Sequence, residues 1–187
     1  MYPYINYLCS IKNKPSGRKV VPHHINRNPF KAQIIMNANN STVALLQLIL
    51  SGLQGGSQLH YLHAIINRRN GFTKLADRMM EEFDEETKAI ETVSNRLLAL
   101  GATPQVAPET FEVFTSVEEQ LRNECQAQVE GIAQLEAAFR ALTDLDVTTE
   151  IFLTEYIKDE NEHAEWLIQQ VNLIDQIGIQ NYLAKQI

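Results

Sequence analysis

The sequence predicts an all-α protein built as a four-helix bundle with one long crossover connection. Three observations lead to this fold class. Apolar residues recur every three or four positions through four long stretches, two of the connections between these stretches are short, and the third holds two prolines. The 187 residues, 44% of them apolar, suffice for one domain with a real core. The longest apolar run, Val43 to Leu50, is far shorter than the roughly 20 residues that a membrane-spanning helix needs, so we expect no membrane span.

The first two helices are predicted on either side of a tight turn. Several residues that favour helix N-caps follow Met36, and the apolar period then continues to Asn70-Gly71. A second helical period runs from about Phe72 to Leu100, and Gly101 follows it as a helix stop. These two helices are therefore expected to form an antiparallel pair.

A connection over residues 101–115 has no helical period and is long enough to travel the length of a helix. The third helix is predicted over 116–142 and the fourth over about 146–175. Gly178 then separates a short terminal piece, residues 179–187. Helices of this length extend about 40 Å at 1.5 Å per residue, which fits a bundle with a single crossover.

The first 35 residues differ in character from the rest. They hold four of the six prolines and six basic residues but no sustained helical period, so residues 1–35 are predicted to be a basic, disordered arm and residues 36–187 the folded domain. Three interpretations of the arm stay open: sequence upstream of a true start at Met36, a basic arm for nucleic acid or another partner, and an organelle transit segment.

Charge and cysteine content narrow the class of protein further. Residues 1–76 contain nine basic and no acidic residues, whereas 77–187 contain seven basic residues and all 23 acids. Cys9 and Cys125 have no paired spacing, so neither a disulfide framework nor a cysteine metal site is expected. The apolar stretch from Tyr4 to Ile11 is short and precedes the basic residues, unlike a signal peptide. We therefore expect a cytoplasmic protein.

Charged residues on the predicted apolar stripes indicate a possible metal centre. Glu160 and His163 are three positions apart on the fourth helix, so both project from one face, and Glu86 lies on the inner face of the second helix. Two carboxylates and an imidazole in a bundle core suit a divalent metal such as iron or manganese. Alternatively, Glu160 and His163 belong to an acidic surface run, residues 159–163.

Several segments resemble the bacterioferritin family in the right order. The matching stretches are residues 58–64, 74–77, 84–86, 117–122, 158–167 and 173–183. The resemblance covers about 36–187 and implies a ferritin-like bundle whose short fifth helix helps to close a cage of 24 subunits that stores ferric mineral. It also implies six ligands for two irons, of which this chain keeps Glu86, Glu160 and His163. Leu53, Ala89 and Gln128 stand where the family has glutamate, histidine and glutamate.

The resemblance therefore implies an impaired ferroxidase centre. One iron position loses both ligands that it does not share with the other, at Leu53 and Ala89. The other iron position keeps His163 and has the neutral amide of Gln128. His60, in place of a family tyrosine, is expected to pair with Glu86 or Glu160, or else to act as a replacement metal ligand. His63 matches a family histidine outside the centre and is expected in surface packing or a helix contact.

Two further local features bear on the centre. Gly52, Gly55 and Gly56 lie within one predicted helix, which indicates close backbone approach to a neighbouring helix or local unwinding. Glu82 and Glu85 are expected near the cavity of the cage, as nucleation sites for mineral.

The haem of the family is bound by a methionine after the second-helix glutamate, but Thr87 stands there, so we expect no haem through this chain.

Three functions compete on the sequence. The first is an iron-storage cage subunit with impaired or absent ferroxidase activity. It is expected to assemble with a catalytically complete subunit, and a cage of this chain alone is the alternative. The second is an active ferroxidase with an unusual metal site that uses His60 and Gln128. The third is a DNA-protecting ferritin-like protein, because residues 98–104 resemble a segment of that group. That group lacks the terminal helix matched here, so nucleic acid is not the expected partner.

Overall fold

The computed structural model describes residues 42–143 and 145–187 and shows five helices there. The elements are α3 (Thr42–Arg69), α4 (Thr73–Ala99), α5 (Val117–Arg140), α6 (Val147–Ile177) and α7 (Ile179–Leu183). The four long helices were predicted, with ends that agree to within about two residues wherever both ends are described. The predicted arm, residues 1–35, and the start of the first predicted helix lie outside the described residues.

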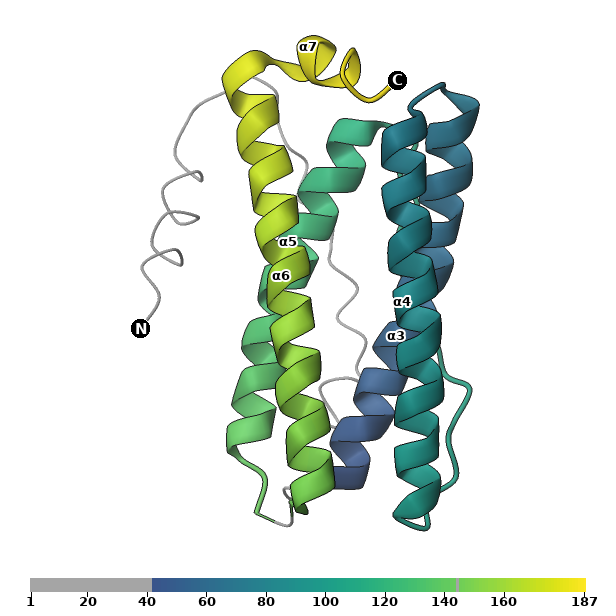
Figure 1. The fold of residues 1–187 in the computed structure, drawn as a ribbon, viewed down its shortest axis with the longest axis vertical. Coiled ribbons are helices and arrows are strands. Elements are labelled where there is room, and N and C mark those ends of the chain that lie inside the picture. Colours follow the sequence, from purple (N-terminus) through teal and green to yellow (C-terminus); the bar gives the residue numbers. More distant parts are fainter. Residues whose placement is uncertain (1–41, 144) are drawn as a thin grey trace.

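The helices form two antiparallel pairs joined by a crossover (Figure 1). Helices α3 and α4 lie side by side as one pair, and α5 and α6 form the other. Residues 100–116 run back along the bundle, so that α5 starts at the same end as α4, and α7 crosses that end. Among the described helices, none combines the length and the apolar character that crossing a membrane would require.

Turn residues set where the helices end. Gly71, Gly101 and Gly178 each have a positive φ, of 85°, 76° and 77°, which glycine adopts without the strain that a Cβ brings. At the start of α6, the Asp146 side chain accepts a hydrogen bond from the Thr149 backbone N–H. Helix α6 therefore has a capped start, close to the residue where the fourth helix was predicted to begin.

The crossover is bound to the outer face of α3. The Gln47 side chain donates to the Thr103 carbonyl at 2.8 Å, and the Gln54 side chain donates to the Gln105 carbonyl at 2.9 Å. Gln54 also accepts from the Ala107 backbone N–H at 3.0 Å. These amide side chains replace the missing helical hydrogen bonds of the crossover, as unpaired backbone groups require.

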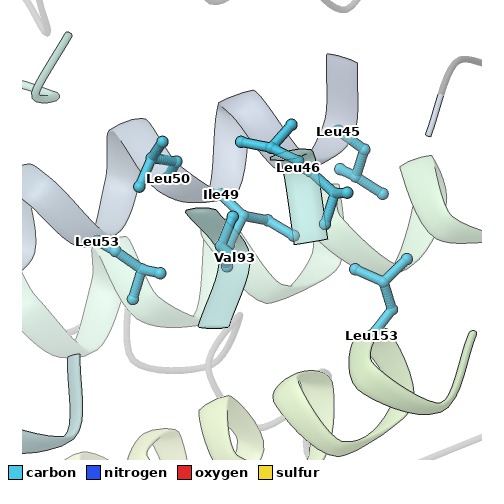
Figure 2. Close-up of a cluster of buried hydrophobic side chains, with 8 residues drawn as sticks. Leu45, Leu46, Ile49, Leu50, Leu53, Val93 and Leu153 are labelled. Atoms are coloured by element: carbon cyan, nitrogen blue, oxygen red, sulfur yellow. The ribbon is translucent and has the colours of Figure 1, made fainter. Parts of the chain in front are cut away.

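Two apolar clusters fill the bundle at different heights. The first lies toward the start of α3 and joins it to α4 and α6 (Figure 2). Its buried members are Leu45, Leu46, Ile49, Leu50, Leu53, Val93, Leu97 and Leu153. The second lies toward α7, with the buried residues Leu75, Val117, Leu121, Cys125, Leu167, Val171, Ile174 and Tyr182. Along α6, the polar residues Glu160 and His163 fall between the two clusters.

Candidate metal centre

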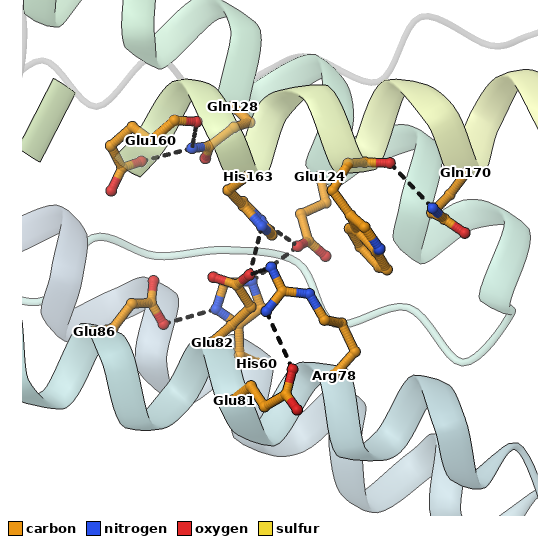
Figure 3. A network of polar contacts seen from close by, with 11 residues as sticks. His60, Arg78, Glu81, Glu82, Glu86, Glu124, Gln128, Glu160, His163 and Gln170 are labelled. Atoms are coloured by element: carbon orange, nitrogen blue, oxygen red, sulfur yellow. Dashed lines mark hydrogen bonds and ion pairs between the residues drawn. The ribbon is translucent and has the colours of Figure 1, made fainter. Parts of the chain in front are cut away.

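His60 lies at the middle of a buried polar network (Figure 3). Its Nδ1 is 2.7 Å from Oε2 of Glu86, and its Nε2 is 2.9 Å from Oε1 of Glu124. The His60 side chain is 8% exposed, and so is that of Glu124. The prediction that His60 pairs with Glu86 agrees with this geometry, whereas Glu124 is a partner that sequence reasoning did not identify.

His163 enters the same network from α6. Its Nε2 lies 3.2 Å from Oε1 of Glu124, the oxygen that also contacts His60. Its Nδ1 lies 2.7 Å from Oε1 of Glu82, which is an ion-pair distance. The rings of His60 and His163 meet edge to face, with centroids 5.8 Å apart. We call His60, Glu82, Glu86, Glu124 and His163 the histidine–carboxylate cluster.

Arg78 and Trp166 border the cluster on the side of α7. Arg78 forms an ion pair with Glu82 one turn along α4, and its guanidinium lies 5.2 Å from the centre of the Trp166 ring. Trp166 in turn stacks on His163, with ring centroids 6.0 Å apart. The Trp166 ring thus separates His163 from solvent while Arg78 adds a positive charge beside Glu82.

Electrostatics favour the charged forms of most groups in the cluster. Burial opposes a charge on His163, but its contacts with Glu124 and Glu82 outweigh burial and raise its pKa to about 9. The same balance raises the pKa of His60 well above its ordinary value, through Glu124 and Glu86. Despite burial, the two imidazoles hold the pKa of Glu124 far below its usual range. In the metal-free protein the cluster is therefore a set of buried ion pairs.

His63 lies beside this cluster in a different state. Its side chain is 1% exposed, and its Nδ1 is 3.9 Å from Oε2 of Glu124, too far for a hydrogen bond. Burial lowers the pKa of His63 to about 4, so the ring is neutral at neutral pH. Of the two roles expected for His63, surface packing disagrees with its burial, whereas a helix contact agrees with it, because the residue faces the core between α3 and its neighbours.

Gln128 and Glu160 form a separate pair, one turn nearer the first apolar cluster. The amide nitrogen of Gln128 donates to Oε2 of Glu160 at 2.6 Å and to the Glu160 backbone carbonyl at 3.2 Å. Both partners are acceptors, which sets the orientation of the amide. Glu160 also contributes, after burial, to the raised pKa of Tyr156. Gln128 thus satisfies two hydrogen-bond acceptors of Glu160, and only the amide oxygen of Gln128 is left for other partners.

Leu53 and Ala89 belong to the apolar interior. Leu53 is 3% exposed and packs in the first cluster, and Ala89 is partly buried against the same cluster. Glu86 and Glu160, two of the ligand positions that the resemblance implies, contact different partners, since Glu86 contacts His60 and Glu160 contacts Gln128. Glu86 and Glu160 still lie close enough for the charge of Glu160 to add to the burial that raises the pKa of Glu86.

The glycines of α3 make room for atoms from outside the helix. A Cβ on Gly56 would collide with the Glu86 carboxylate, and one on Gly55 would collide with the backbone of Glu109 in the crossover. Gly52 has open space around it. The close approaches are therefore to a side chain and to the crossover, not to a neighbouring helix backbone. Local unwinding was the wrong alternative, because α3 is continuous through all three glycines.

Sequence reasoning missed Glu124 and misplaced Glu82. Glu124 lies four residues before Gln128 and three after Leu121, so the helical period already put it on the inner face of α5. Glu82 was expected near the cavity of a cage, but it is 6% exposed and contacts His163. Glu85, the other expected nucleation residue, is exposed. The signal that could have found Glu124 and Glu82 was their spacing of one helical turn from Gln128 and Glu86, which were already singled out.

The fold and the site define an all-α bundle with a buried histidine–carboxylate centre, and comparisons with known proteins agree. A family model described as a ferritin-like domain matches residues 43–177. A bacterial ferritin of Neisseria meningitidis serogroup B is 31% identical over 154 residues, which span 81% of this chain and all of that protein. A bacterial ferritin of Pseudomonas aeruginosa is 29% identical over 155 residues, with the same coverage of both chains. A bacterioferritin of Mycobacterium leprae is 27% identical over 128 residues, 67% of this chain and 80% of that one.

The chain belongs to the ferritin-like family. The six positions that the bacterioferritin resemblance assigns to a pair of irons nevertheless do not fit such a pair here. Leu53 and Ala89 offer no ligand atom, and the amide nitrogen of Gln128 occupies an oxygen of Glu160. Among the described residues, the side chains that converge as candidate metal ligands are instead His60, Glu124 and His163, and only His163 is one of those six positions.

Proposed function

We propose that the chain is an iron-storage cage subunit of the bacterioferritin type with an impaired or absent ferroxidase centre, which assembles with a catalytically complete subunit. The names of its relatives, bacterial ferritin and bacterioferritin, support the storage role. The observation that carries the catalytic part is the apolar burial of Leu53 together with Ala89, at two positions that the paired centre requires.

Loss of these two ligands removes one iron position. A paired ferroxidase passes electrons from two neighbouring ferrous ions to oxygen, so one remaining position does not support the fast reaction. Introducing an ion beside Leu53 would also place a charge against an apolar cluster, where nothing compensates its dehydration. Slow, unsaturable oxidation is the behaviour that this arrangement predicts for the chain alone.

Retention of the whole subunit fold supports assembly. The residues that follow α7 are tied to the start of α4 by hydrogen bonds from the Lys74 backbone N–H to the Gln186 carbonyl, 3.0 Å, and from Lys74 Nζ to the Lys185 carbonyl, 2.9 Å. Tyr61, Leu62 and Ile65 on α3 are 41%, 42% and 49% exposed. Exposed apolar side chains grouped on one helix suit contact with another ferritin subunit.

Oxygen consumption after anaerobic loading with ferrous iron tests the catalytic proposal. The chain assembled alone is expected to oxidise iron little faster than buffer does. The matched gain-of-function variant is Leu53→Glu with Ala89→His and Gln128→Glu, which restores the ligand types of the family. A saturable burst at two irons per subunit in the unaltered chain would contradict the proposal.

Subunit mass analysis of the natively isolated protein tests co-assembly. A mixed cage is expected to release this chain together with a second ferritin-type subunit. Cages that contain this chain alone would leave the storage role intact and overturn the partnership. The same masses test whether the folded unit proposed for residues 36–187 is preceded by residues 1–35 in the native protein.

Haem binding through this chain is not part of the proposed function. Thr87 is exposed, and its hydroxyl donates to the Phe83 carbonyl at 2.8 Å within α4. A hydroxyl offers no soft ligand of the kind that methionine supplies to haem iron. A Soret absorption band from the homogeneous protein would contradict this part of the proposal.

A further inference from the structure

We propose that His60, Glu124 and His163 form a binding site for one divalent transition-metal ion, which shares only His163 with the six positions of the paired-iron centre. The site combines two imidazoles and one carboxylate from three different helices, α3, α5 and α6. It deepens the proposed function and rests on it, because His163 is also a ligand position of the paired centre and serves only one of the two sites.

The donor atoms already converge. One ligand atom each from His60, Glu124 and His163 lies within 4.8 Å of the other two. Oε1 of Glu124 is 2.9 Å from Nε2 of His60 and 3.2 Å from Nε2 of His163. Zinc-type ions bind such atoms at about 2.0–2.2 Å, which sets neighbouring ligand atoms roughly 3–3.5 Å apart. Small side-chain rotations therefore suffice to admit an ion at this point.

The other nitrogen of each imidazole faces a carboxylate of α4. Nδ1 of His60 lies 2.7 Å from Glu86, and Nδ1 of His163 lies 2.7 Å from Glu82. Metal-bound histidines generally present their second nitrogen to a carboxylate or carbonyl, which orients the ring and increases its basicity. Glu86 and Glu82 supply that support to both rings, so each Nε2 is aimed at the point where the three ligands meet (Figure 3).

Within the described part of the chain, a buried carboxylate oxygen at this point lacks a hydrogen-bond partner. It is Oε2 of Glu124, whose contact with Nδ1 of His63 is 3.9 Å long, beyond hydrogen-bond distance. An unpartnered buried polar atom is costly, and a bound ion is one of its ordinary explanations. The side chains of Glu124 and His163 are only 8% and 9% exposed, so bulk water offers them little compensation.

The ligand types define the class of ion. Two imidazoles and one carboxylate are found at mononuclear non-haem ferrous sites and at zinc sites that keep an open position. The same set is poor for Mg²⁺ and Ca²⁺, which prefer oxygen alone. We assign the site to Fe²⁺, Zn²⁺ or Co²⁺, with Zn²⁺ and Co²⁺ as probes that do not react with oxygen in the assay.

The experiment measures metal binding by the full-length, assembled protein after treatment with a chelator. Titration with Co²⁺, followed by its visible absorption, is expected to saturate at one tight ion per subunit that Zn²⁺ displaces. X-ray absorption of the Zn²⁺ form is expected to show two imidazole ligands. This measurement uses the unaltered chain, so the test does not depend on whether a variant folds.

Four variants identify the residues that hold the ion. Glu86→Gln removes an orienting carboxylate and is expected to weaken Co²⁺ binding roughly 10- to 100-fold. Glu124→Gln and His60→Gln remove direct ligands and are expected to weaken Co²⁺ binding by more than that. Glu119→Gln, an exposed position on α5, is the matched control and should leave binding unchanged.

The outcomes separate this site from the paired-iron centre. Binding of two ions per subunit that depends on Glu160 but not on Glu124 would overturn both the new site and the proposed impairment. Absence of imidazole ligands, or unchanged binding in Glu124→Gln, would overturn the new site alone. One ion held by His60, Glu124 and His163 without a ferroxidase burst is the result that supports both.

Discussion

Two neighbouring turns of the same bundle, an apolar turn and an ionic turn, have opposite character. The turn that contains Leu53, Ala89 and Gln128 has apolar or neutral side chains at three positions where the bacterioferritin resemblance implies metal ligands. The next turn toward α7 gathers His60 and Glu124 beside His163, all buried. Apolar and neutral side chains therefore occupy these positions of one turn, while a dense ionic network occupies the neighbouring turn.

The difference shows two ways in which the interior deals with buried charge. Glu86 faces His60, and Glu160 faces Gln128, so each carboxylate has a hydrogen-bond donor within reach. Where no carboxylate remains, the space is filled by Leu53 and the surrounding apolar side chains. Both solutions avoid an unpaired buried charge, but only the turn around His60 keeps a set of atoms that can bind a metal.

The largest effect is expected from breaking the ionic turn. In chelator-treated protein, Glu124→Ala should lower the free energy of unfolding by about 3–5 kcal/mol, because His60 and His163 lose the carboxylate that they share. Denaturant titration measures the change. The control is Glu119→Ala on the exposed side of the same helix, expected to stay within about 0.5 kcal/mol of the unaltered chain. Equal stability of the two variants would show that the cluster contributes no net pairing.

A somewhat smaller effect is expected from the apolar turn. Leu53→Ala removes a buried side chain from the first cluster and should cost about 3 kcal/mol, through lost burial and the cavity left behind. Ile151→Ala, 54% exposed on α6, is the matched control. Thermal unfolding followed by circular dichroism distinguishes them. A loss below about 1 kcal/mol for Leu53→Ala would mean that this level of the bundle is loosely packed.

The smallest effect links the two turns through a glycine. Gly56→Ala places a methyl group against the Glu86 carboxylate, so Glu86 must move away from His60. Loss of this charged hydrogen bond costs about 2 kcal/mol, and the gain of about 1 kcal/mol from alanine in a helix leaves a net loss of about 1 kcal/mol. Gly52→Ala has open space and should instead stabilise the protein by up to about 1 kcal/mol, because alanine is the better helix former. Opposite shifts in melting temperature are expected. The same sign for both would deny that Gly56 accommodates Glu86.

Local signals account for the success of the predicted fold. The stops at Gly71, Gly101 and Gly178 act within a few residues, so the sequence shows them directly. The sequence left open whether His60 pairs with Glu86 or with Glu160, and it did not indicate that Gln128 donates to Glu160. These choices depend on which side chains of neighbouring helices lie at the same level.

The histidine–carboxylate cluster could not be predicted from the sequence for another reason. His60, Glu82, Glu124 and His163 come from four helices, and their meeting depends on the relative height of those helices. A shift of one turn, about 5.4 Å, would pair His163 with Glu86 and Gln128 instead. Helical period places a residue on a face, but it does not specify which turns of neighbouring helices lie at the same level.

The bound crossover also has a consequence for the order in which the chain folds. The hydrogen bonds of Gln47 and Gln54 to the crossover join residues 51–58 positions apart, whereas α3 and α4 meet across a short turn. Contacts between near neighbours close first, since long loops cost more entropy. We expect the α3–α4 pair to form early and to present a finished surface on which the crossover docks. Pulsed hydrogen exchange would then protect amides within α3 and α4 before the crossover amides of Gln105 and Ala107, which bond to the Gln47 and Gln54 side chains.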